Sequence, residues 1–355
     1  MKPIITFANW GNYTILFKNL CQELNIEAIP PEKTNPKAIV EGAKIAPEMY
    51  CFPLKVNLGN YLEAIKKGAN TILMATASGG SCRLRYYGVV QEKVLREAGY
   101  NVKFIIFDQD IKDIYKKIKE ISGLNFWQIL KAFFSFYKKL RFIEKIEERA
   151  RFLRPREVQK GMTDKVFQES LQKIENSNPK DFPKIKKEIL KRFSEIKFEK
   201  KEVPKVGLIG EIYTVCDPAV NFEIEKKLGN MGIEVHREMS LSYHLKKKIF
   251  FTDFFIQRKI RPYLESTVGG HGRDAIYEML KYIKKGFDGI IHLLPAMCMP
   301  EVTVRPILEK LHLESGIPFL SLSIDEEVAE AGVNTRIEAF VDVVKNYYKN
   351  KHLKK

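Results

Sequence analysis

Short apolar runs alternate with stretches of helical periodicity in the first part of the chain. The runs at Ile4–Ala8, Thr71–Ala75 and Val102–Phe107 have the length and composition of buried strands. The stretches Tyr13–Leu24 and Leu84–Ala98 place apolar residues at helical spacing between them. Because parallel strands need helical crossovers, this alternation predicts a mostly parallel sheet with helices on its faces, which is an α/β fold.

The same alternation returns near residue 203. A helix is expected over Pro218–Leu228, because Asp217 is a favourable N-cap and proline fits the first helical position. Further strands are expected at Val206–Ile209, Ile233–His236, Gly289–Leu294 and Ile317–Leu322.

The middle of the chain lacks any strand-like run. Its apolar residues, from Trp127 to Ile143, recur at helical spacing. The pattern predicts two Rossmann-like domains with parallel sheets and a helical insertion between them. We assign residues 1–110 to the first Rossmann-like domain, 111–202 to the basic helical insertion and 203–355 to the second Rossmann-like domain.

The charge of the chain is concentrated in this insertion. The 355 residues carry a net charge of +16, and residues 111–202 hold 25 basic and 14 acidic side chains. Such a segment suits nucleic acid, a membrane surface or an acidic protein, but it also suits a solvated helical face. No zinc-finger spacing or RNA-binding motif is present, so nucleic acid is not expected. Without a long apolar run or a signal peptide, we expect a cytoplasmic protein with no membrane contact.

The cysteines point to candidate chemistry. Five cysteines are too few, and odd in number, for a disulfide scaffold. Cys51, Cys82 and Cys298 stand in loops at the ends of predicted elements, where open α/β sheets bind ligands. Three thiolates from separate loops suit a catalytic zinc ion or a [4Fe–4S] cluster with one open iron, although unrelated thiols would give the same spacing. Cys21 fits a buried position on the first helix.

Several stretches carry a family resemblance. Residues 46–53 (APEMYCFP), 78–83 (SGGSCR) and 295–301 (PAMCMPE) resemble the 2-hydroxyacyl-CoA dehydratase and benzoyl-CoA reductase subunit family. Residues 210–213 (GEIY), 268–272 (VGGHG), 325–326 (DE) and 335–340 (TRIEAF) look most like its activase-associated branch, to which the double-cubane cluster proteins are related.

The resemblance implies a [4Fe–4S] cluster held by Cys51, Cys82 and Cys298 between the two domains. It also implies a homo- or heterodimer that accepts a low-potential electron from an ATP-hydrolysing activator protein. The chemistry implied is reduction or dehydration of an acyl-CoA thioester in anaerobic metabolism. Two adjoining clusters would need about six thiolates, so five cysteines favour one cluster per chain.

Other side chains are candidates near this site. His271, in a Gly-rich loop before a helix, is a candidate acid or hydrogen-bond donor, or else the cap of a tight turn. Glu211 follows a predicted strand and is the second catalytic candidate. Cys216 is a pocket thiol, a further ligand or a plain helix residue, whereas His292 fits a core histidine. The alternative function is a non-catalytic electron-relay subunit, or a metal-free subunit that binds a small molecule.

Overall fold

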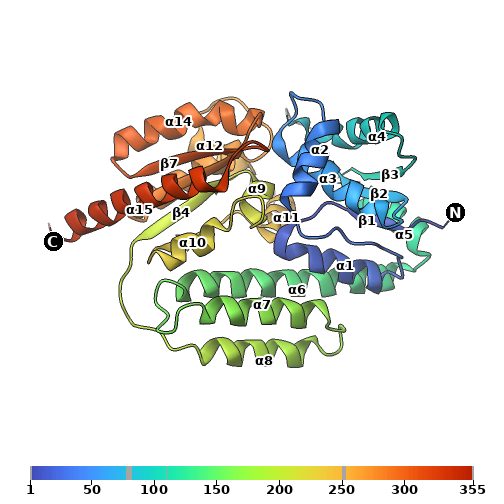
Figure 1. Cartoon of the computed structure of the whole chain (residues 1–355), viewed down its shortest axis with the longest axis horizontal. Coiled ribbons are helices and arrows are strands. Elements are labelled where there is room, and N and C mark those ends of the chain that lie inside the picture. Colours follow the sequence, from blue (N-terminus) through green and yellow to red (C-terminus); the bar gives the residue numbers. More distant parts are fainter. Residues whose placement is uncertain (1, 77–81, 109, 250–252, 354–355) are drawn as a thin grey trace.

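Parallel β-sheets form the framework of the protein. The computed structural model describes residues 2–76, 82–108, 110–249 and 253–353, and within these ranges the strands form two parallel sheets. Figure 1 shows one sheet in the N-terminal part of the molecule and the other in the C-terminal part, each with helices packed around it. The predicted α/β fold class is therefore confirmed.

The N-terminal sheet pairs its strands in the order β1-β2-β3. Leu73 of the central strand pairs in parallel register with Phe7 on one side and Ile105 on the other. Parallel pairing requires a crossover after each strand, and helices supply it. The elements are β1 (Ile5–Phe7), η1 (Gly11–Tyr13), α1 (Thr14–Glu23), α2 (Pro36–Ile45), α3 (Phe52–Lys66), β2 (Thr71–Ala75), η2 (Arg83–Tyr86), α4 (Tyr87–Glu97) and β3 (Lys103–Phe107).

Helices α2 and α3 pack with their backbones in contact. A Cβ atom on Gly59 would lie 1.8 Å from the carbonyl oxygen of Ala38, and one on Gly42 would lie 2.0 Å from that of Lys55. Only glycine permits this approach, which fixes α3 and therefore the residue that precedes it, Cys51.

The predicted insertion folds as a layer of helices. Asn125 and Gln128 form a reciprocal capping box at the start of the long helix α6, and Gly123 ends α5 in the left-handed conformation. Figure 1 shows α6, α7 and α8 side by side beneath both sheets. The helices are α5 (Ile111–Ser122), α6 (Phe126–Leu153), α7 (Met162–Glu175) and α8 (Phe182–Ser194).

The C-terminal sheet has the strand order β5-β4-β6-β7. Every residue of β6 is buried, as expected for a central strand with helices on both faces. The elements are β4 (Lys205–Gly210), α9 (Ile212–Cys216), α10 (Ile224–Asn230), β5 (Glu234–His236), α11 (Leu241–Ile249), α12 (Asp253–Ile260), α13 (Gly272–Lys284), β6 (Gly289–Pro295), α14 (Met299–Ser315), β7 (Phe319–Ile324) and α15 (Glu330–Leu353).

The helix predicted over Pro218–Leu228 is wrong in its first half. Asp217 follows the short helix α9 as its C-cap, and α10 starts only at Ile224. Phe222 and Glu223 have φ values of +57° and +54°, which no right-handed helix accommodates. The chain turns at these residues.

The largest hydrophobic core is shared by all parts of the chain. It joins Tyr13 and Leu16 from α1 and its preceding turn, Leu140 from α6, and Val206 and Leu208 from β4. The predicted domain boundaries, after residues 110 and 202, stay predictions, because this core includes residues from all three predicted segments. In the described ranges, no helix is long and apolar enough to cross a membrane.

Candidate metal centre

The predicted ligand cysteines share one structural position, the residue immediately before a helix. Cys51 is the N-cap of α3, Cys82 that of η2, which continues into α4, and Cys298 that of α14. Pro53 and Pro300 lie at the first turn of their helices, where a missing N–H leaves no helical hydrogen bond unmade. Each thiol therefore lies beside the positive end of a helix.

The Cys51 and Cys298 loops contact each other directly. The backbone N–H of Phe52 donates a hydrogen bond to the carbonyl of Ala296 at 3.2 Å. Both cysteines are buried, and both belong to the hydrophobic cluster that contains Met74 of β2. Two loops that are about 250 residues apart in sequence thus pack side by side.

Arg83, the residue after Cys82, links the Cys82 segment to the Cys51 and Cys298 loops. The guanidinium of Arg83 donates hydrogen bonds to the carbonyls of Met49 and Met297, which lie in the Cys51 and Cys298 loops. A Cβ atom on Gly270 would lie 3.8 Å from the Cys82 Sγ atom, so the loop before α13 borders the site as well. Cys82 is partly exposed.

The three thiols have similar electrostatic surroundings. Burial raises the pKa of all three thiols, and that of Cys51 rises to about 11. The nearby carboxyl of Glu211 raises each of these pKa values further, whereas Arg83 lowers those of Cys51 and Cys82. As they stand, the thiols are protonated at neutral pH, and a bound cation would favour their thiolate form.

The donor chemistry of the three thiols is compatible with a cluster. Among the described residues, no three His, Cys, Asp or Glu side chains lie close enough together to hold one metal ion. In an iron–sulfur cubane each cysteine binds a different iron. The cysteine Sγ atoms therefore lie farther apart than the ligand atoms around a single metal ion do. Three thiols at helix N-termini also match the negative charge of a thiolate-bound cluster.

Comparison with protein families finds a match in the C-terminal part. Residues 271–344 match the family described as 2-hydroxyglutaryl-CoA dehydratase, D-component. The match supports the expected resemblance to the 2-hydroxyacyl-CoA dehydratase family. The matched segment runs from α13 into α15 and contains Cys298, but it does not include the other two cysteine loops. No curated protein is similar enough to count as a match.

The segment matched to the dehydratase family begins at His271, the N-cap of α13. Its Nε2 atom lies 3.3 Å from Nδ1 of His244, which comes from α11. Burial, assisted by the charge of Lys247, lowers the pKa of His271 to about 3. The ring is therefore neutral at physiological pH and suits hydrogen bonding better than proton donation from an imidazolium.

Glu211 is engaged as a helix cap. Its Oε1 atom accepts from the backbone N–H of Tyr213 at 3.0 Å, and Oε2 accepts from that of Thr214 at 2.9 Å. Burial raises its pKa, although these hydrogen bonds to the carboxylate oppose the rise. A catalytic role for Glu211 stays a prediction, and any such role would have to disturb this cap.

Sequence reasoning missed His244, because it assigns no helix to residues 241–249, which form α11. Glu301 is expected from the sequence only as a helix cap. Glu301 follows Cys298 in the first turn of α14, and its buried Oε2 atom lies 2.8 Å from Nε2 of His292. His292 is fully buried and also lies 3.3 Å from the hydroxyl of Ser321, so it is a core histidine with polar partners.

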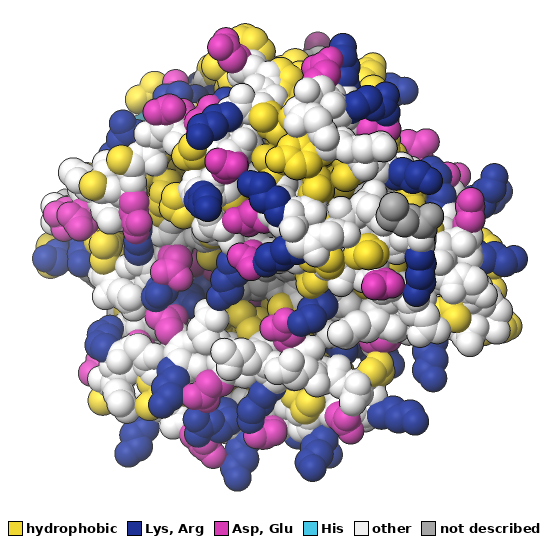
Figure 2. All heavy atoms as spheres, turned by 45° about the vertical axis from the view of Figure 1, so that its right-hand side comes forward, with side chains coloured by type: hydrophobic (Ala, Val, Ile, Leu, Met, Phe, Trp, Pro, Cys, Tyr) yellow, Lys and Arg dark blue, Asp and Glu magenta, His cyan; other side chains and the backbone are white. Residues whose placement is uncertain are grey.

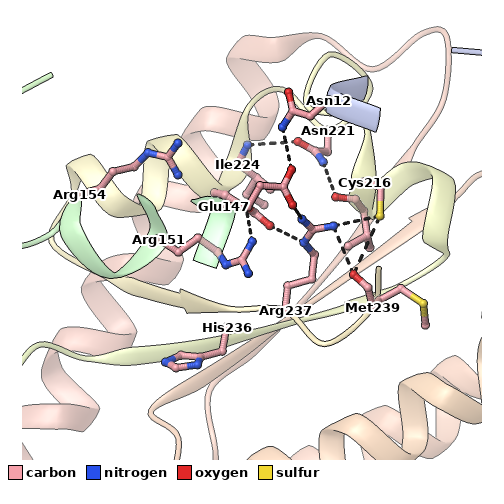
Figure 3. A network of polar contacts seen from close by, with 12 residues as sticks. Asn12, Glu147, Arg151, Arg154, Cys216, Asn221, Ile224, His236, Arg237 and Met239 are labelled. Carbon is pink, nitrogen blue, oxygen red and sulfur yellow. Dashed lines mark hydrogen bonds and ion pairs between the residues drawn. The ribbon is translucent and has the colours of Figure 1, made fainter. Parts of the chain in front are cut away.

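The two remaining cysteines lie elsewhere. Figure 3 shows Arg237 pointing toward Cys216 and Glu147, and its Nη1 donates to the Cys216 Sγ atom at 3.0 Å. Cys216 ends α9 within this buried polar network, and Cys21 is buried on α1. The stretch 78–81 of the Cys82 motif lies outside the described residues.

Proposed function

We propose that this protein binds a [4Fe–4S] cluster through Cys51, Cys82 and Cys298. The protein receives a low-potential electron from an ATP-hydrolysing activator and uses it in reductive or dehydration chemistry. One observation supports the proposal most directly. The Cys51 and Cys298 loops are joined by the hydrogen bond from Phe52 to Ala296, and Arg83, the residue after Cys82, donates to a carbonyl of each loop.

A bound cluster would supply one-electron transfer and, with three cysteine ligands, one iron site open to a substrate. The chain's own residues prepare this position. The N-termini of α3 and α14 favour the negative charge of the ligands, and Arg83 adds a positive charge beside them. Burial of Cys51 and Cys298 excludes water from two of the ligands.

The substrate and partners belong to the same proposal. An acyl-CoA thioester is the substrate class that fits the family, and a dimer of identical or different subunits is its expected assembly. We expect the protein to act in the cytoplasm, where its thiols remain reduced.

Anaerobic reconstitution with iron and sulfide tests the proposal. We expect brown protein with about four irons per chain and an EPR signal after reduction. Replacement of Cys51, Cys82 or Cys298 by alanine should lower the iron content or alter the signal. The matched control is Cys21→Ala, which removes a buried thiol of α1 from a different hydrophobic cluster and should retain the iron.

Colourless wild-type protein, or zinc in place of iron, would contradict the proposal. So would equal loss of iron in the control variant, because the iron would then not depend on the three loops.

A further inference from the structure

Arg83 links the three cysteine loops. The residue directly follows Cys82, and one guanidinium nitrogen donates to the carbonyl of Met49 while the other donates to that of Met297. Met49 lies two residues before Cys51, and Met297 lies directly before Cys298. A single side chain on the Cys82 segment thus contacts the backbone of both other loops.

The groups around the guanidinium fix its orientation. Arg83 lies over the ring of Tyr50, with its Cζ atom 5.2 Å from the ring centroid. Met297 has a φ of +61°, a left-handed conformation that is strained for a residue with a side chain. The hydrogen bond from Arg83 to the carbonyl of Met297 offsets the backbone strain at this residue.

Other contacts join the loops only in pairs. The hydroxyl of Tyr87, at the start of α4, lies 2.5 Å from the Cys51 Sγ atom and so links the Cys51 loop to the Cys82 segment. The hydrogen bond from Phe52 to Ala296 joins the Cys51 and Cys298 loops only. A planar guanidinium can donate to two carbonyls at once in a fixed geometry, which an ammonium group cannot reproduce.

We infer that Arg83 is a positioning residue whose forked hydrogen bonds hold the Cys51 and Cys298 loops against Cys82. The fork sets the arrangement of the three thiols before any cofactor binds. Its effect on the loops is a property of the folded chain, whereas its consequence for iron rests on the proposed function.

Hydrogen exchange of the metal-free protein tests the fork. In Arg83→Gln we expect the backbone amides of residues 46–52 and 295–299 to exchange about tenfold faster, because both charge-assisted hydrogen bonds are lost. Arg83→Lys keeps the charge without the fork, so it should exchange nearly as fast as Arg83→Gln. The control is Arg85→Gln, which removes an exposed arginine from the same turn and should exchange like the wild type.

Unchanged exchange in Arg83→Gln would overturn the inference. So would wild-type exchange in Arg83→Lys, since charge alone would then suffice, or equal acceleration in Arg85→Gln.

A second readout concerns the reconstituted protein. The EPR line shape of Arg83→Lys should differ from that of the wild type, because the loops hold the ligands differently although the charge is kept. A wild-type line shape in this variant would overturn the consequence for iron. If the wild type binds no iron, the proposed function fails, and the exchange data still decide whether the fork exists.

Discussion

Arg237 is a buried residue that forms ion pairs with two carboxylates. Its side chain is 3% exposed and lies 2.7 Å from carboxylate oxygens of both Glu147 and Glu225. Glu147 comes from α6 and Glu225 from α10, and Figure 3 shows Glu147 beside the guanidinium. Asn12 and Tyr13 add hydrogen bonds to Glu147, so the network joins the N-terminal part, the insertion and the C-terminal part.

We expect Arg237→Met to lower the free energy of unfolding by about 3–5 kcal/mol, because it leaves the buried Glu147 without its counter-charge and, among the described residues, leaves Glu225 paired with Arg151 alone. Urea denaturation measures the change. The matched control is Arg305→Gln, which breaks an ion pair whose side chains are about half exposed and should cost less than about 1 kcal/mol. If Arg237→Met lowered the free energy of unfolding no more than the control does, the network would not stabilise the fold as a unit.

Sequence alone predicts the local setting of single residues better than their partners. The prolines after Cys51 and Cys298 indicate that a helix starts beside each thiol, as the structure has it. The pairing of His271 with His244 was not predictable, because it depends on the packing of α11 against α13.

At the level of elements, the crossing of α2 and α3 positions Cys51. Gly59 faces the backbone of Ala38 too closely for any side chain, so the crossing allows no local adjustment. The fully buried start of α3 transmits any shift of this helix to its N-cap.

Gly59→Ala should therefore lower the free energy of unfolding by about 1–3 kcal/mol, as overpacked sites do. Gly332→Ala provides the control, because no atom lies within 4 Å of its added Cβ and alanine is the better helix former. We expect this control to be neutral or slightly stabilising in thermal unfolding. If both variants had the same free energy of unfolding, α2 and α3 would be able to move apart around the added methyl group without loss of stability.

The failed helix at Pro218–Leu228 shows the limit of local signals. Asp217 does cap the turn that follows it, since its side chain accepts from the N–H of Ala219, and it also accepts from the hydroxyl of Thr34. The left-handed backbone of Phe222 and Glu223 then interrupts the chain before α10, and no local signal in the sequence predicts that interruption.

At the level of the whole molecule, one hydrophobic core spans the two lobes and the insertion. Residues of α1, α6 and β4 belong to the same buried cluster. We expect the full chain to unfold in one transition by both circular dichroism and fluorescence, and a fragment of residues 203–355 to lack a cooperative transition. Two separate transitions, or a stable fragment, would show that the lobes fold independently.

Part of the charge of the insertion is paired locally. Figure 2 shows Lys and Arg along the lower edge of the molecule, where α7 and α8 lie, with Asp and Glu between them. Lys173 pairs there with Glu188, and Arg192 pairs with Glu169. These pairs favour a solvated face among the alternatives for the basic segment.

Composition and periodicity predict the sheets and the helical insertion, but not which loops meet. The approach of the Cys51 loop to Ala296 depends on how the two sheets pack, and no local pattern encodes that packing.

The wide spacing of the three thiols along the chain has a consequence for biosynthesis. Cys82 leaves the ribosome about 200 residues before Cys298, which corresponds to roughly 10–40 s of translation. During that interval the nascent protein carries two of its thiols without the third. Premature metal capture or oxidation at Cys51 and Cys82 is thus a hazard peculiar to the growing polypeptide, and folding of the last third of the chain ends it.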